Sequence, residues 1–86
     1  MAITVNVVSA DEQIWSGEAE MLVARTTEGE IGILTGHTPL LAILAGGEVR
    51  VTQVGGRKLV VNAEDGFISV QNDTVTVVAR AAELVS

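Results

Sequence analysis

Residues 48–63 read EVRVTQVGGRKLVVNA, and this stretch decides the fold class. Apolar and polar residues alternate before the glycine pair, so that Val49 and Val51 share one face, and a second segment of strand length, residues 57–63, follows the pair. Alternation with a period of two is typical of a half-buried β-strand. Gly55-Gly56 predicts a two-residue hairpin loop, because both central residues of such a loop favour positive φ. The stretch therefore predicts a β-hairpin.

Short alternating segments separated by turn residues fill the rest of the chain. Asn72-Asp73 predicts a hairpin turn of the I′ type, and residues 9–12 predict another turn. Ser16-Gly17, Ala45-Gly46-Gly47 and Glu64-Asp65-Gly66 predict further breaks between strands. The segments number about ten: residues 3–8, 13–15, 18–27, 31–34, 40–44, 48–54, 57–63, 67–71, 74–79 and a last strand or frayed helix start at 80–85. Many short strands with close turn signals indicate an all-β sandwich or barrel.

Composition excludes several classes of protein. The chain has 86 residues, which predicts one domain, and 48% of them are hydrophobic, which argues against disorder. A net charge of −6 with one Trp, one Phe and no Tyr argues against nucleic-acid binding. The absence of cysteine excludes disulfides and thiol chemistry. No signal peptide and no run of about 20 apolar residues is present, so we expect a soluble protein without direct membrane insertion.

Residues 28–41, EGEIGILTGHTPLL, depart from plain strand and turn, since they hold three glycines, the only His and the only Pro. The glycines match neither the dinucleotide-binding nor the P-loop pattern. His37 alone cannot assemble a zinc site without cysteine, and no serine lies in a G-x-S-x-G elbow. Glu28 and Glu30 flank a glycine and are expected to be solvated or to face basic residues of a partner. We predict no cofactor, no metal and no catalytic residue here, but a contact surface.

Two apolar features remain. The run Leu40–Leu44 has the length of a strand, and we expect it to be core, with a minority of it exposed as an interface patch. Trp15 is expected to anchor the core or cover one end of the sandwich.

Four segments together resemble one protein family. Residues 28–41 closely resemble the hallmark segment of the epsilon subunit of F-type ATP synthases. VVSADEQIWSG at 7–17, DGFISV at 65–70 and VTVVA at 75–79 resemble further segments of that family in the same order. This chain departs from the family at Thr35, where Pro is usual, and at Asp65, where Gly is usual.

The resemblance implies a flattened β-sandwich of about ten short strands over residues 1–86, and a non-catalytic rotor subunit of the central stalk. Its implied partners are the gamma subunit and the c-ring, with the catalytic alpha/beta hexamer contacted indirectly, and its role is to help couple proton flow to ATP synthesis. The implied location is the cytoplasmic face of a bacterial cell membrane. The C-terminal helical hairpin common in full-length relatives is absent from these residues, so neither ATP binding nor inhibition is assigned. The implied partner-contact residues are Glu28, Glu30, Gly32, His37, Leu40 and Leu41.

Two alternatives of other classes stay open at this point. One is a small all-β ligand-binding module with a pocket near Trp15 and Phe67. The other is a hydrolytic enzyme that uses His37.

Overall fold

The computed structural model describes residues 2–10 and 12–85, which form strands and connecting loops. No helix in this part of the chain is long and apolar enough to span a membrane. The turn predicted at residues 9–12 includes Asp11, which lies outside the described residues; Ser9 N donates to Glu12 O at 2.8 Å across it. Within the described residues the six strands are β1 (Ile3–Val8), β2 (Gln13–Thr26), β3 (Gly29–Ile33), β4 (Leu40–Gln53), β5 (Lys58–Gln71) and β6 (Thr74–Leu84).

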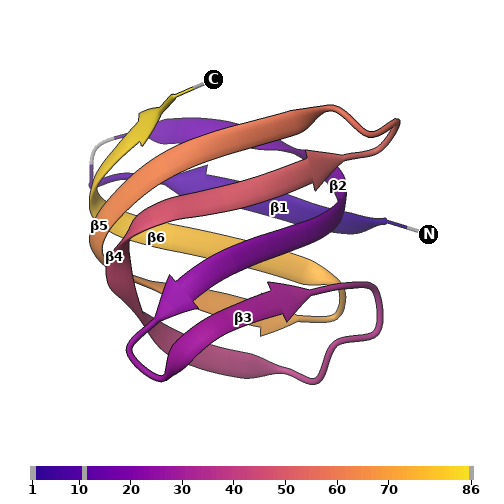
Figure 1. Cartoon of the computed structure of the whole chain (residues 1–86), viewed down its shortest axis with the longest axis horizontal. Helices are drawn as coiled ribbons and strands as arrows, with labels where there is room; N and C mark the ends of the chain where they lie inside the picture. The colour runs from indigo at the N-terminus through magenta and orange to yellow at the C-terminus, as the bar shows by residue number, and fades with distance from the viewer. Residues whose placement is uncertain (1, 11, 86) are drawn as a thin grey trace.

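The strands form one closed, barrel-like sheet (Figure 1). Their order is β1-β6-β5-β4-β2-β3, and a further pairing between β1 and β2 closes the ring. β1 runs parallel to β6, and the other pairings are antiparallel. The first half of β2 pairs with β1 and its second half with β3. The all-β class is therefore confirmed.

The prediction of about ten strands is wrong, because four predicted breaks lie inside continuous strands. β2, β4, β5 and β6 each join two of the predicted segments. Pairing between β4 and β5 keeps one register from Ile43↔Phe67 to Gly47↔Ala63, on both sides of the glycine pair. Glycine bends a strand sharply without ending its ladder, and such bends let a sheet curve into a barrel. The turn signals marked corners of the barrel rather than strand ends.

The corner of β5 has unusual backbone geometry. Asp65 has φ 55°, a left-handed conformation that Asp adopts more readily than most residues. Its carboxylate lies 3.0 Å from the Arg80 guanidinium on β6. At the neighbouring Gly66, an added Cβ would lie 1.9 Å from the Val78 carbonyl oxygen and 2.6 Å from the Cα of Ala79. β5 and β6 therefore approach here to a distance that only glycine permits.

The two hairpin turns differ in outcome. Asn72 and Asp73 have φ 51° and 58°, so the I′-type turn between β5 and β6 is confirmed. The prediction of a two-residue loop at Gly55-Gly56 is wrong. Gln53 N donates to Arg57 O at 2.7 Å, and three residues lie between these two hydrogen-bonded residues. Both glycines nevertheless have positive φ, as that prediction required.

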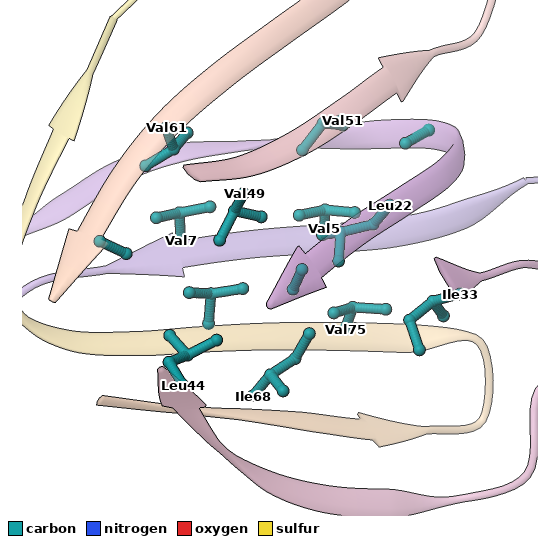
Figure 2. Packing of buried hydrophobic residues seen from close by; sticks show 14 of the residues in the cluster. Val5, Val7, Leu22, Ile33, Leu44, Val49, Val51, Val61, Ile68 and Val75 are labelled. Carbon is teal, nitrogen blue, oxygen red and sulfur yellow. The ribbon is translucent and has the colours of Figure 1, made fainter. Parts of the chain in front are cut away.

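Inward-facing aliphatic side chains fill the barrel (Figure 2). The alternation seen in the sequence predicts them correctly: Val49 and Val51 are buried on one face of β4. Trp15 is partly buried and packs against this core, as expected, with its ring over Gly17, where an added Cβ would lie 2.8 Å from the ring carbon Cζ2. The largest fully buried side chains are Ile3, Leu22, Ile33, Ile68, Val5, Val7, Val49, Val51, Val61, Val70, Val75 and Val77.

Candidate protein-contact surface

The loop that carries His37 joins β3 to β4 and is hydrogen-bonded to the hairpin turn between β5 and β6. His37 N donates to Leu34 O at 3.2 Å, which closes a turn containing Gly36 at φ 84°. The Gly36 N–H donates to the Asp73 carboxylate at 2.7 Å, and the Thr4 N–H donates to Asp73 O at 2.9 Å. Asp73 therefore joins three segments that are distant in the sequence.

The His37 side chain makes a local backbone contact. Its ring Nδ1 lies 2.6 Å from Thr38 O, which matches the expectation that the ring hydrogen-bonds nearby backbone. Its neighbours in the loop are backbone groups rather than a nucleophile, and Ser16 Oγ donates to Asn6 Oδ1 instead, at 2.8 Å. The geometry gives no support to the hydrolase alternative.

We expect Asp73→Gly to loosen the His37 loop without disturbing the hairpin turn, because glycine accepts the positive φ while the carboxylate acceptor is lost. The loss of one exposed, charge-assisted hydrogen bond is expected to cost about 1 kcal/mol of stability. Exchange of the Gly36 amide proton, followed by NMR, is expected to accelerate several-fold. Asp73→Asn keeps an acceptor oxygen and serves as control; equal acceleration in both variants contradicts the assigned role of Asp73.

Glu28 and Glu30 lie on opposite sides of Gly29 and face different surroundings. Glu28 is in the β2–β3 turn, where its N–H donates to Thr26 Oγ1 at 3.2 Å and Thr26 Oγ1 donates to Gly29 O at 2.8 Å. Glu30 is on β3, directly opposite Arg25 of β2. It lines a hollow of about 230 Å³ together with Arg25, Gly47, Glu48 and Arg50.

The apolar run at the start of β4 divides by alternation between the two faces of the sheet. Leu44 is buried and Leu40 and Ala42 pack against the core, whereas Leu41 is 69% exposed and Ile43 57%. Three of the five residues face the core and two are exposed, so the expectation of a core run with a minority exposed is confirmed. A strand of an antiparallel sheet alternates in this way when one face of the sheet meets the core and the other meets solvent.

The outward side chains of the run belong to a larger apolar patch. Ile43 lies opposite Phe67 on β5, Phe67 lies opposite Val78 on β6, and Val78 lies opposite Val8 on β1. Directly opposed side chains on one face of a sheet are in contact range. We call the set Leu41, Ile43, Phe67, Val78 and Val8 the apolar patch. Phe67 is 38% exposed although it is one of only two aromatic residues.

A groove adjoins the apolar patch. It has a volume of about 400 Å³, which is within the range of binding pockets. We call it the seam groove; its lining residues are Thr26, Thr27, Glu28, Ile31, Leu40, Leu41, Ala42 and Ile43.

Only some of the predicted contact residues meet in one place. Glu28, Leu40 and Leu41 line the seam groove, and Glu30 lines the separate charged hollow. Gly32 is exposed on β3 and His37 is half-buried in the loop; neither lines one of these two hollows.

The sequence analysis included Ile43 in the run Leu40–Leu44 but missed Phe67, which is 38% exposed, and the half-buried Val78 and Val8 as contact candidates. The signal was present, because the buried Ile68 and Val70 place Phe67 on the outer face of β5 by alternation.

Other kinds of site find little support. No group of three or more His, Asp or Glu side chains in residues 2–10 and 12–85 is placed to hold a metal ion. Trp15 packs toward the core, whereas Phe67 is on the outer face, so the two aromatic residues do not line a common pocket. The exposed apolar patch and the groove beside it fit contact with another protein better.

Comparison with known proteins agrees on one family. The family profile described as "ATP synthase, Delta/Epsilon chain, beta-sandwich domain" matches residues 2–85. The ATP synthase epsilon chain of Frankia casuarinae is 49% identical over 85 residues, covering 98% of this chain and 99% of that one. The epsilon chain of Micrococcus luteus is 48% identical, covering 95% and 90%, and that of Rhodococcus erythropolis is 43% identical, covering 95% and 68%.

Two solved structures are similar to this chain. A chain of the OSCP/F1/c-ring assembly of the Euglena gracilis mitochondrial ATP synthase superposes with a TM-score of 0.90 at 29% identity, over 96% of this chain and 53% of that one. A chain of the Tetrahymena thermophila mitochondrial ATP synthase central stalk and c-ring gives a TM-score of 0.74 at 15% identity, over 93% and 64%; this second likeness concerns the fold alone. The chain thus spans about half to two thirds of these solved chains.

Proposed function

The chain belongs to the family of ATP synthase delta and epsilon chains, and from this premise we propose that it binds the gamma subunit and the c-ring in the central stalk of a proton-translocating enzyme. It is an epsilon-type, non-catalytic subunit of ATP synthase. Its proposed role is to help couple proton flow to ATP synthesis. The observation that carries the proposal is the match to epsilon chains of similar length, which covers 98% of this chain and 99% of one relative and 95% and 90% for another.

The apolar patch supports a stable protein partner. Leu41 and Ile43 expose most of their side chains beside Phe67. Contiguous exposed apolar side chains on a small domain mark interaction sites, and aromatic residues are enriched in the core of protein interfaces. We assign this patch to the gamma subunit, because a permanent partner is the one that keeps such a surface covered.

The acidic segment supports a second, polar contact. Glu28 and Glu30 are exposed, and exposed charges contribute mainly to orientation and specificity at the edge of an interface. We assign Glu30 and Gly32 to the side that faces the polar loops of the c-ring and His37 to the boundary between that side and gamma. Glu28 lines the seam groove beside the apolar patch and is assigned to the gamma side. Leu40 and Leu41 line the seam groove, and Leu41 also belongs to the apolar patch, so we assign both to the gamma side. The domain extends over residues 1–86 and is peripheral to the cytoplasmic face of a bacterial cell membrane.

Binding to gamma is the direct test. Titration calorimetry with the cognate gamma subunit is expected to give a stable one-to-one complex and no nucleotide hydrolysis by this chain alone. If no complex forms at micromolar concentrations of both proteins, the proposed function is wrong.

Reversal of one acidic charge tests the contact with the ring. We expect Glu30→Lys to lower proton-driven ATP synthesis in reconstituted vesicles by about 2- to 10-fold, because a like-charge contact at an interface opposes docking. Binding to isolated gamma is expected to stay unchanged. Glu83→Lys, an exposed acidic residue near the end of β6, is the matched control. Unchanged synthesis in the Glu30 variant argues against this assignment.

A further inference from the structure

The ring of β1, β6, β5, β4 and β2 is closed, but β3 lies outside it and leaves a seam between itself and the start of β4 (Figure 1). In the described residues β3 pairs with β2 alone, and residues 40–42 of β4 pair with β5 alone. The seam is closed at one end, where Thr27 N donates to Ile43 O at 3.0 Å. Two strand edges with unpaired backbone groups therefore face each other across the seam groove.

The seam also leaves core side chains incompletely covered. Ile31, Leu40 and Ala42 belong to the inward face and pack against the core, yet all three are only partly buried and line the seam groove. The groove thus combines partly exposed apolar side chains with free N–H and C=O groups.

This combination favours an extended polypeptide as the occupant. A strand added to a free edge satisfies the backbone groups and places alternate side chains in the pockets beside it. A helix or a small apolar molecule satisfies none of these groups. β3 has five residues, which sets the length of the paired segment at about the same number.

The charge of the groove restricts the occupant further. Glu28 is the charged residue among those that line it, and no basic residue does so. A second copy of this chain is disfavoured, because pairing β3 with β3 brings Glu28 and Glu30 of both copies together in a protein of net charge −6. A basic residue at one end of the incoming segment complements Glu28.

We propose that the seam groove receives an extended segment of the partner subunit that covers the apolar patch. The segment pairs with the free edge of β3, carries apolar residues at alternate positions and places a Lys or Arg beside Glu28. This inference rests on the proposed function and deepens it, since Leu41 and Ile43 belong to both the patch and the groove.

Hydrogen exchange of the complex tests the pairing. In the complex with the cognate gamma subunit, amide protons of β3 that point away from β2 are expected to exchange at least about 10-fold more slowly than in the free chain. If gamma binds and protects the apolar patch but leaves exchange in β3 unchanged, the seam inference is overturned while the proposed function stands. Failure of gamma to bind at all overturns both.

A charge variant tests the predicted basic residue. Glu28→Lys is expected to weaken binding to gamma about 5- to 10-fold, whereas Glu18→Lys, an exposed residue on the half of β2 that pairs with β1, is expected to leave it unchanged. Thermal unfolding of both variants confirms that each is folded. Equal affinity of the Glu28 variant and the unchanged chain overturns the charge assignment and with it the proposed occupant.

Discussion

Gly66→Ala is expected to destabilise the domain by at least about 3 kcal/mol, since overpacking against rigid backbone is among the costliest single substitutions. The added Cβ would lie 1.9 Å from the Val78 carbonyl oxygen. No side-chain rotation relieves this contact, so β5 and β6 must separate at the corner. For a domain of this size the loss corresponds to a fall in melting temperature of about 12–24 °C, measurable by circular dichroism.

Gly32→Ala is the matched control for this prediction. It also lies in a strand, yet an added Cβ meets nothing within 4 Å. Its melting temperature is expected to stay within about 4 °C of the unchanged chain, which corresponds to about 0.5 kcal/mol. If both variants lose a similar amount of stability, the close approach of β5 and β6 at the corner is not the reason that Gly66 must be glycine.

Ile43→Asp is expected to weaken binding to the gamma subunit about 100-fold, while the isolated domain keeps its stability. The side chain is 57% exposed and lies beside Phe67 in the apolar patch. In the complex the substitution removes an apolar contact and desolvates a carboxylate. A 100-fold loss of affinity corresponds to about 2.8 kcal/mol of binding free energy. Titration calorimetry measures the affinity for gamma, and thermal unfolding measures the stability of the isolated domain.

Val54→Asp is the control for the patch. Val54 is 56% exposed, nearly the same as Ile43, but lies in the loop between β4 and β5. The same new charge at an equally exposed apolar position is expected to leave affinity for gamma within about 2-fold. If both variants bind as well as the unchanged chain, the apolar patch is not the gamma contact.

Much of the fold was predictable because alternation is a local property. The buried residues Ile3, Val5 and Val7 of β1, Val49 and Val51 of β4, and Val75 and Val77 of β6 follow from the alternation of apolar and polar residues. The strand count was not predictable: Ala45-Gly46-Gly47 carries the same turn signal as Gly55-Gly56, but the first bends β4 and the second ends it. What separates the two cases is the neighbouring strand. β5 holds the ladder on both sides of Gly46, and this pairing joins residues about 20 positions apart.

The candidate site was predictable to a lesser degree. Glu28, Leu40 and Leu41 were chosen by resemblance and line one groove, yet Gly32 and His37 lie outside it. The row from Val8 to Ile43 crosses four strands, and its members come together only through the registers between them.

The sequence by itself determined the all-β class, the inward residues of β1, of the Val49–Val51 segment and of the start of β6, the I′-type turn at Asn72-Asp73 and the family, because each depends on residues close together in the chain or on motifs in order. Tertiary structure alone decided which glycines bend a strand, how β1 closes the barrel, and that β3 leaves a seam beside an exposed apolar patch. The physical reason is that hydrogen bonds between distant strands, rather than local backbone preference, select among the conformations that glycine and alternating residues allow.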